Sequence, residues 1–471
     1  MKEAFQGRGR PTMAWLTAAL ALRLMFAFLF PHTGGDSPIY ETFARNLLHH
    51  HVYSHIPAEG TAPPPPTLIR SPGYPLFLAA IFSVAGDSNE TAVRIVQAFL
   101  DTFSAALIAV IVFRLARGKR EQRQGAAQFG LALAALCPFV GNYAASILSE
   151  VPATFLFVLA VLAAIKALQS DSPGRNWFWC GVATGAATLF RPETGLWLVV
   201  PGAIVLWRTR KGGTTESAEV LRPGTALCAI VLMFVGLVIP LLPWTARNLV
   251  SLKTFQPLSP FYAEDPNEFV PRGYMKWCRT WLWRFRELDA YIWPVDGQPV
   301  SFEGLPPGAV EGADQAQRVS ELFKRYNEQL TMTPDLDTQF GQLARERVHA
   351  HPVRFFVTLP MLRGVALWFT PRREILPLEG KLWPVAEAFE DDPRDFSFTA
   401  LLFFVNLGYL VLALRGGVRL WSAGSTGFLL VAGSIVLRTV FFAFFTFPEP
   451  RYTLEVYPLL IVLASFAGGS D

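Results

Sequence analysis

The sequence predicts an all-α polytopic membrane protein, and three observations support this prediction. Of its 471 residues, 52% are hydrophobic and only 17% are charged, whereas a soluble domain carries about 25% charged residues. Apolar runs of roughly the length of a bilayer-spanning helix recur along the chain. Basic clusters separate several of these runs, as the positive-inside rule describes. An ordinary soluble enzyme and a disordered chain are excluded, and a net charge of +4 does not indicate nucleic-acid binding.

The first apolar run extends from about Met13 to Phe30, after a terminus that carries Lys2, Arg8 and Arg10. The run is too long for a signal-peptide core and no A-x-A cleavage site follows it, so we expect an uncleaved first span. The positive charges before it predict a cytoplasmic N-terminus.

Further spans are predicted from the remaining apolar runs. These lie near residues 92–113, 126–142, 146–168, 177–190, 194–207, 224–246, 396–414, 425–447 and 453–468. A short run at 74–86 is expected to be re-entrant, because the basic cluster Arg114–Arg120 then falls on the cytoplasmic side with Arg208–Lys211 and Arg415–Arg419. The apolar piece at 353–370 is expected to be an interfacial helix. The total is about ten spans, within a range of about eight to thirteen, with both termini cytoplasmic.

This topology predicts three regions. Residues 1–248 form a transmembrane module whose first outer loop is 32–72, residues 249–395 form an extracytoplasmic or interfacial segment, and residues 396–471 form C-terminal transmembrane helices. Within the second region, the spaced Leu, Phe and charged residues of 311–349 predict one or two amphipathic helices.

The first outer loop contains candidate site residues at both ends. It begins His32-Thr33-Gly34-Gly35-Asp36-Ser37-Pro38-Ile39-Tyr40-Glu41, and a helix is expected from Ser37 to Leu48. Asp36 or Ser37 could cap the first turn of that helix. The functional alternative is a carboxylate at the mouth of a membrane cavity, able to accept a proton from an attacking hydroxyl. Near the end of the loop, Arg70 either snorkels to headgroups or binds a phosphate as a fork of donors.

Other polar residues stand at predicted outer ends of spans. They are Glu150 in Ser149-Glu150-Val151-Pro152, Arg191 in Phe190-Arg191-Pro192-Glu193, and Trp244 and Arg247 in Pro243-Trp244-Thr245-Ala246-Arg247-Asn248. Ionisable residues at membrane depth are functional candidates, although a charge at the end of a span can simply face water. Trp244 suits the interfacial aromatic belt, and Arg247 is a further candidate phosphate ligand.

Two other patterns have competing explanations. Five of the seven histidines lie between His32 and His55; His tracts can bind metal, but the spacing lacks a helical pair with supporting carboxylates, so no metal is expected there. The aromatic stretch 274–283 could stack on sugar rings or anchor at headgroups.

The order of these signals resembles a known family. Asp36 after the first span is followed by R-x-P-G-Y-P-L-F-L from Arg70, S-E-x-P, G-x-A-x-G-x-x-T-L-x-R-P-E, P-W-x-x-R-N, and a late R-Y at Arg451-Tyr452. This set resembles bacterial GT-C glycosyltransferases, and among them the dolichyl-phosphate-mannose-protein mannosyltransferase-like group that includes the lipid A aminoarabinose transferases.

The resemblance implies a fold and a reaction. The fold is a GT-C-type bundle with extracytoplasmic loops and juxtamembrane helices. The reaction moves a hexosyl or pentosyl group from a polyprenyl-phosphate carrier to an acceptor hydroxyl, with inversion, on the periplasmic or extracellular face of the inner (plasma) membrane. Protein hydroxyls, lipid A, cell-wall glycan and small lipids are all compatible acceptors. Apart from donor and acceptor, membrane lipids are the expected partners.

The resemblance also implies roles for site residues. Asp36 is the catalytic base or acceptor-orienting group, and the donor phosphate is bound by Arg70, Arg191 and Arg247. The cavity-lining or acceptor-orienting residues are Tyr40, Tyr74, Glu150, Trp244, Arg451 and Tyr452. The family commonly has Asp-Glu in the first loop, whereas Ser37 follows Asp36 here. We therefore expect no cofactor, with a divalent metal as the less favoured alternative.

Two other functions remain as alternatives. A transporter or flippase would also carry ionisable residues at membrane depth, but the chain shows no repeated halves, and its polar motifs gather on one predicted face. A non-catalytic scaffold would tolerate Asp36→Asn, whereas a transferase would lose turnover.

Overall fold

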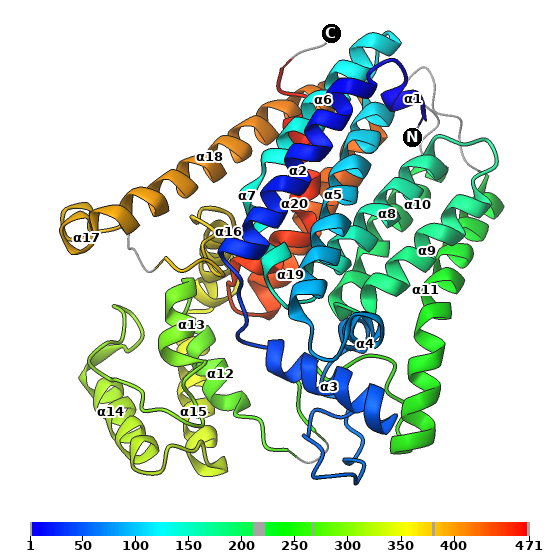
Figure 1. The fold of residues 1–471 in the computed structure, drawn as a ribbon. Coiled ribbons are helices and arrows are strands. Elements are labelled where there is room, and N and C mark those ends of the chain that lie inside the picture. The colour runs from blue at the N-terminus through cyan, green and yellow to red at the C-terminus, as the bar shows by residue number, and fades with distance from the viewer. Residues whose placement is uncertain (1, 211–221, 266–267, 379–381, 469–471) are drawn as a thin grey trace. The chain divides into compact units, whose positions relative to one another are not determined.

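The structure is a computed structural model that describes residues 2–210, 222–265, 268–378 and 382–468 (Figure 1). Within these ranges the chain is helical, and β-type pairing is limited to an isolated bridge between His32 and Ser146. The predicted all-α fold class is therefore confirmed. The chain divides into two compact units, of which unit 1 comprises Met1–Asp265, Pro371–Leu437 and Leu454–Asp471, and unit 2 comprises Pro266–Thr370 and Arg438–Thr453.

Unit 1 holds most of the apolar helices. Its elements are α1 (Lys2–Phe5), α2 (Gly9–Leu29), α3 (Ser37–His50), α4 (Gly73–Ala85), α5 (Glu90–Leu115), α6 (Arg120–Leu136), α7 (Pro138–Gly141), η1 (Asn142–Ala145), α8 (Glu150–Leu168), α9 (Gly174–Thr188), η2 (Pro192–Leu198), α10 (Val199–Arg210), α11 (Pro223–Leu252), α17 (Val385–Asp391), α18 (Pro393–Ser422) and α20 (Tyr457–Ala464).

Unit 2 is built mainly from shorter helices. They are α12 (Arg272–Arg279), α13 (Phe285–Tyr291), α14 (Gly312–Gln329), α15 (Pro334–Ala350), the π-helical turn η3 (Arg354–Thr358) and α16 (Leu359–Trp368). Two elements, α19 (Thr426–Phe445) and η4 (Pro450–Val456), begin in one unit and end in the other. The amphipathic helices predicted within 311–349 are confirmed as α14 and α15.

The described chain contains six helices that are long and apolar enough to cross a membrane: α2, α5, α8, α11, α18 and α19. The pair Arg120–Leu136 and Pro138–Ala145, bent by 50°, makes a seventh span if it is counted as one. The expected count of about ten is therefore not confirmed. The runs near 177–190, 194–207 and 453–468 contain α-helices of 15, 12 and 8 residues. At 1.5 Å per residue these helices reach about 12–22 Å, less than the hydrocarbon thickness of about 30 Å.

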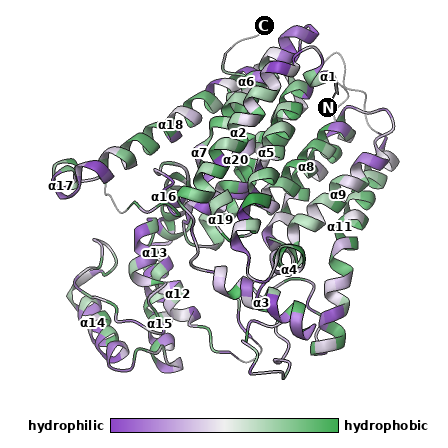
Figure 2. Ribbon diagram, in the orientation of Figure 1, coloured by the Kyte–Doolittle hydropathy of each residue, from purple (hydrophilic) through white to green (hydrophobic). Residues whose placement is uncertain are grey.

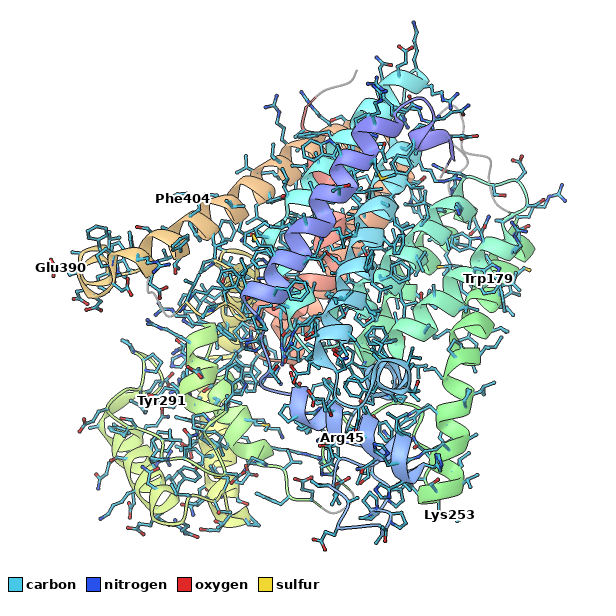
Figure 3. All side chains as sticks on the ribbon, in the orientation of Figure 1. Arg45, Trp179, Lys253, Tyr291, Glu390 and Phe404 are labelled. Atoms are coloured by element: carbon cyan, nitrogen blue, oxygen red, sulfur yellow. The ribbon has the colours of Figure 1, made fainter. Side chains whose placement is uncertain are left out.

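Hydrophobic residues follow the long helices of unit 1, and hydrophilic residues collect at the helix ends (Figure 2). Large apolar side chains on these helices are exposed, among them Trp179 of α9 at 54% and Phe404 of α18 at 65% (Figure 3). Exposed apolar surface of this extent suits contact with lipid. The chain is therefore an integral membrane protein.

A buried arginine donates hydrogen bonds to the end of α6, where the chain breaks before α7. Pro138 lacks an N–H donor, so the last carbonyl groups of α6 need other partners. Arg23 of α2 donates from Nη1 to the carbonyl of Ala135 at 2.6 Å and from Nη2 to that of Ala134 at 2.8 Å. Its Nε forms a buried ion pair with Asp101 of α5 at 2.7 Å. One side chain thus joins α2, α5 and α6.

Glycines bring the backbones of α9 and α11 together. A Cβ added to Gly185 would lie 2.3 Å from the carbonyl oxygen of Leu237, and one added to Gly181 would lie 2.1 Å from that of Met233. No side chain fits at such distances, so this contact requires small residues. Both glycines belong to the motif that contains Arg191 and ends at Glu193, and the part of the motif that holds the glycines therefore serves packing.

Replacing Gly185 by alanine is expected to destabilise the protein by about 1–3 kcal/mol, because the added methyl group forces α9 away from α11. The matched control is Gly408→Ala on α18, where an added Cβ meets nothing within 4 Å and alanine favours the helix by about 1 kcal/mol. Thermal melting in detergent measures both variants. A Gly185→Ala protein as stable as its parent would contradict the described packing.

Unit 2 has its own aromatic core. Trp277 is fully buried and contacts Phe323 and Phe340 at ring-centroid distances of 5.8 and 5.1 Å, which joins α12, α14 and α15. Tyr274 and Trp281 are buried beside it. The expectation that these aromatic residues stack on sugar rings or anchor at headgroups is wrong for Tyr274, Trp277 and Trp281, because they fill this core.

The three predicted basic clusters lie at one end of unit 1, apart from Lys211, which is outside the described residues. Gln169 directly follows α8 and donates to the carbonyl of Arg114 at 2.9 Å. Arg208 of α10 donates to the carbonyl of Leu168, the last residue of α8, at 3.2 Å. Arg117 donates to the carbonyl of Ala423, which directly follows α18. The C-terminal ends of α5, α8, α10 and α18 therefore meet, as the positive-inside pattern requires. We call this the basic end of unit 1.

Candidate active site

The candidate site begins in the first loop, at the opposite end of unit 1. The 21 residues of α2 carry the chain about 32 Å from the basic end. Asp36 directly precedes α3, but its side chain makes no capping hydrogen bond, and the hydroxyl of Ser37 donates to the carbonyl of Ile147 instead. The predicted capping role is therefore wrong. The Nη2 atom of Arg70 lies 2.7 Å from Oδ1 of Asp36, and the two side chains are 23% and 27% exposed.

The charges of this ion pair act on Tyr40, one turn into α3. Its side chain is buried and meets the ring of Tyr74 edge-on, with centroids 5.1 Å apart. Burial raises the pKa of Tyr40 to about 12, and the negative charge of Asp36 adds to this effect. The phenol therefore stays protonated at neutral pH, so it can donate a hydrogen bond but cannot act as a base. Tyr74 in turn donates to Oε1 of Gln97 at 3.0 Å, which fixes its ring.

Arg191 lies at the centre of a cluster of three carboxylates. Its Nη1 is 2.9 Å from Glu150, and its Nε is 2.8 Å from Glu455 and 3.0 Å from Glu193. Glu150 and Glu455 are almost completely buried. Thr194 donates to the other oxygen of Glu455 at 2.8 Å. The positive charge of Arg191 is thus already matched by carboxylates, and its predicted contact with the donor phosphate stays a prediction.

Arg247 holds the first loop against α11. It donates to the carbonyl groups of Thr67 and Tyr53, each at 2.9 Å. The hydroxyl of Tyr53 donates to the carbonyl of Arg70 at 2.9 Å, so Arg247 is linked to Arg70 through one residue. Trp244 is buried against the ring of Tyr53, and the expectation that it lies in an interfacial belt is wrong. The predicted phosphate contact of Arg247 stays a prediction.

Arg451 and Tyr452 belong to unit 2. Arg451 forms an ion pair with Glu449, and the ring of Tyr452 stacks on Phe442 with centroids 4.5 Å apart. Their predicted contribution to the cavity is not tested by these contacts.

A carboxyl pair that the sequence pattern did not reveal includes a residue of α3, the helix that follows Asp36. Glu41 of α3 is half-buried, and the negative charge of Glu90 at the start of α5 acts on it. Glu90 also accepts a hydrogen bond from Thr33 at 2.8 Å and pairs with Arg94. Two neighbouring carboxyl groups disfavour each other's ionisation. Burial and the charge of Glu90 accordingly raise the pKa of Glu41 to about 7.

This carboxyl pair predicts a pH dependence of stability. The pKa of Glu41 rises from 4.5 to about 7 on folding. Its contribution to the free energy of unfolding is therefore fully present below pH 4.5 and is lost as the pH rises through about 7. The melting temperature of the parent should therefore fall between pH 4.5 and about 7, and that of Glu41→Gln should not show this fall. Glu59→Gln, which alters an exposed carboxylate of the same loop, is the control and should keep the decline. Parallel profiles for Glu41→Gln and the parent would contradict the assignment.

The described residues contain no group of three or more His, Cys, Asp or Glu side chains arranged to hold a metal ion. His49, in the histidine tract, instead lies 3.1 Å from the carboxylate of Asp87. Whether the reaction requires a metal is not decided by this arrangement, and metal independence stays a prediction.

Part of the chain matches a known protein family. Residues 69–244 match the model of the family described as dolichyl-phosphate-mannose-protein mannosyltransferase. The predicted resemblance to this family is confirmed. The match includes Arg70, Tyr74, Glu150, Arg191 and Trp244, whereas Asp36 and Tyr40 precede it. No curated protein sequence matches the chain.

Solved structures with a similar fold include a membrane glycosyltransferase. The oligosaccharyltransferase AglB from Archaeoglobus fulgidus, in complex with an inhibitory peptide and a dolichol-phosphate, matches with a TM-score of 0.52 and 11% identity over 98% of this chain and 50% of AglB. The apo form of the same oligosaccharyltransferase matches with a TM-score of 0.52 and 13% identity, over 98% of this chain and 51% of the oligosaccharyltransferase. ArnT from Cupriavidus metallidurans in the apo state matches with a TM-score of 0.40 and 15% identity, over 96% of this chain and 76% of ArnT.

The likeness to the oligosaccharyltransferase supports a GT-C fold for the chain. The chain spans about half the length of the oligosaccharyltransferase that it matches. At 11–13% identity the likeness concerns the fold, while the matched family identifies the chain as a relative of membrane glycosyltransferases.

Proposed function

We propose that the protein is an integral membrane glycosyltransferase that moves a sugar from a polyprenyl-phosphate carrier to an acceptor hydroxyl on the extracytoplasmic face. The ion pair of Asp36 with Arg70 carries this proposal. It combines a carboxylate and a guanidinium, both partly exposed, at the end of unit 1 opposite the basic clusters. The family match and the apolar helices around the loop agree with a lipid-linked donor.

The chemistry requires both members of the pair. The acceptor oxygen attacks the anomeric carbon from the side opposite the phosphate, and the bond from that carbon to the phosphate oxygen breaks, which inverts the configuration. The hydroxyl proton passes to the carboxylate of Asp36. The electron pair of the broken bond leaves with the phosphate, and Arg70 stabilises the charge that develops there.

The pairing observed at 2.7 Å suggests how donor binding prepares the base. A carboxylate that shares a guanidinium accepts a proton less readily than one that does not. When Arg70 turns part of its donor fork to the phosphate, its attraction for Asp36 weakens, and the carboxylate becomes the better base. Arg247 supports this step by holding Tyr53, which in turn holds the backbone of Arg70.

Release of polyprenyl phosphate from the donor provides the direct test. Purified protein is incubated with synthetic polyprenyl-phosphate hexoses and pentoses and a mixture of acceptor hydroxyls, and released polyprenyl phosphate is measured. At least one donor should be consumed by the parent and not by Asp36→Asn. Folded parent protein that consumes no donor contradicts the proposal. Transport of an intact lipid-linked sugar across vesicles without release would favour the flippase.

We further propose that catalysis needs no divalent metal, since Ser37 stands where the family commonly has a second acidic residue. The release of polyprenyl phosphate from the donor should be unchanged by a chelator. Activity that is lost with the chelator and restored by a divalent ion would contradict this.

A further inference from the structure

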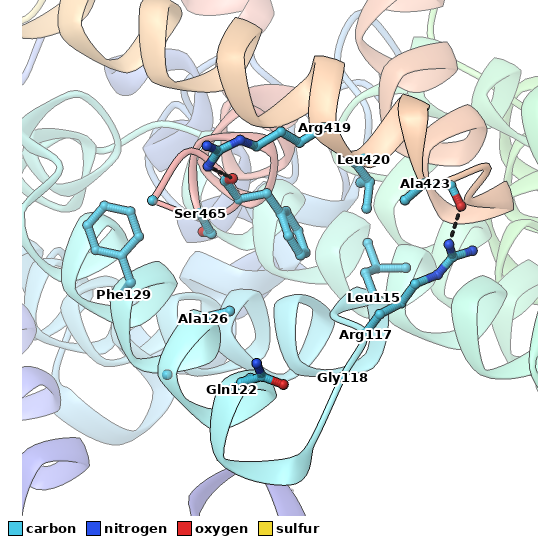
Figure 4. A pocket seen from close by; sticks show the side chains of 13 residues that line it. Leu115, Arg117, Gly118, Gln122, Ala126, Phe129, Arg419, Leu420, Ala423 and Ser465 are labelled. Carbon is cyan, nitrogen blue, oxygen red and sulfur yellow. Dashed lines mark hydrogen bonds between the residues drawn. The ribbon is translucent and has the colours of Figure 1, made fainter. Parts of the chain in front are cut away.

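A cavity at the basic end of unit 1 lies far from the candidate active site. It has a volume of about 580 Å³, is partly open, and is lined by the ends of α5, α6 and α18 and by the segment after α20 (Figure 4). This volume falls in the range of small-molecule sites, about 300–1,000 Å³. Apolar walls come from Leu115, Phe129, Leu420 and Phe466.

Two arginines line the cavity and bridge its walls. Arg117, between α5 and α6, donates to the carbonyl of Ala423 beyond α18. Arg419 of α18 donates from Nη1 to the carbonyl of Ala467 at 2.6 Å. These bonds place each guanidinium at the cavity while occupying few of its five N–H donors. Neither guanidinium has a carboxylate partner within the part of the chain that the structure describes.

The charge around the cavity is strongly positive. Residues 114–124 and 415–423 contain seven Lys and Arg and a single acidic residue, Glu121. These segments lie at the ends of α5 and α18, two candidate spans, which is the level of lipid headgroups. Basic pockets between spans at such a level suit phosphate-bearing headgroups, and each nearby Lys or Arg adds about 1 kcal/mol of attraction to anionic lipid.

We propose that this cavity binds the headgroup of an anionic phospholipid. The phosphate takes the donors that Arg117 and Arg419 have left, and the first acyl carbons lie against Phe129 and Leu420. The occupant is a lipid rather than a soluble phosphate because aromatic and aliphatic side chains share the wall with the arginines. This inference is independent of the proposed transferase activity, since it concerns the other end of unit 1.

Photo-crosslinking tests the proposal. The full-length protein is placed in phosphatidylcholine nanodiscs doped with a photoreactive phosphatidylglycerol, and labelled peptides are quantified. The variant Arg117→Gln/Arg419→Gln should reduce labelling of segments 115–129 and 419–423 by about tenfold. Arg120→Gln/Arg415→Gln removes the same charge from residues that do not line the cavity and should reduce labelling clearly less, because only general attraction to the anionic surface is lost. Equal losses in the two double variants would indicate surface attraction only and overturn the proposal.

A second variant tests the cavity without changing charge. Gly125 lines the cavity, and a Cβ there meets nothing within 4 Å, so Gly125→Leu should fold and fill the space. It should lower labelling as far as the arginine variant does, whereas Gly408→Leu, an equally open position on α18, should not. Undiminished labelling of Gly125→Leu overturns the proposal, as does complete competition by soluble glycerol phosphate. Melting in phosphatidylcholine alone verifies that each variant is folded.

Discussion

Asp36→Asn is expected to lower the rate of sugar transfer by about 10²–10⁴-fold. Asparagine keeps the size of the side chain, and its amide oxygen can still accept a hydrogen bond from Arg70, so the loop should fold as before. The amide cannot take the proton of the acceptor hydroxyl, and only the chemical step should suffer. Single-turnover release of polyprenyl phosphate at saturating donor measures this step.

The matched control is Asp87→Asn, which alters a carboxylate of unit 1 that is 48% exposed and pairs with His49. It should transfer sugar at the parental rate. Arg70→Gln should instead weaken donor use, since it removes the proposed phosphate contact as well as the partner of Asp36. An Asp36→Asn protein within about threefold of the parental rate would show that Asp36 is not the base.

Arg191→Met is expected to destabilise the protein by about 3–5 kcal/mol, because it leaves buried carboxylates without their shared cation. Glu150 and Glu455 are 2% and 1% exposed, so water cannot replace the arginine. Arg191→Met/Glu455→Gln should recover part of the loss, since one buried charge is then removed. The free energy of unfolding, or the melting temperature in one detergent, measures each variant.

Arg318→Met is the control for this second prediction. Arg318 is 42% exposed and pairs with Asp314 and Glu346 on the surface of unit 2, and such pairs contribute about 0–1 kcal/mol. If Arg191→Met keeps parental stability but raises the KM for the donor, Arg191 binds phosphate and its carboxylate cluster is not structural.

The sequence predicted those features that depend on local patterns. Hydrophobic runs located α2, α5, α8, α11, α18 and α19, and the positive-inside rule brought together the basic clusters that the structure places at one end of unit 1. Local patterns failed where the end of a helix depends on distant contacts. Asp36 has the position and chemistry of a cap, but Arg70, 34 residues later, competes for its carboxylate.

The partners of site residues are separated too widely in sequence for spacing to reveal them. Glu455 reaches Thr194 across 261 positions, and no pattern joins those segments. A weaker signal was nevertheless present. Glu455, Arg23 and Asp101 are ionisable residues within or beside apolar runs, and such residues seldom lie in a membrane without partners.

The Arg23–Asp101 pair has a consequence for biogenesis. An unpaired arginine or aspartate near the middle of a span opposes insertion by about 2.5–3.5 kcal/mol, and each of the first two candidate spans, α2 and α5, carries one of these residues. When the second span meets the first, their charges neutralise each other, and Arg23 can reach the free carbonyl groups of α6. We therefore expect α2 to settle in the bilayer only after α5 and α6 have been synthesised, so that these helices enter the membrane as a group.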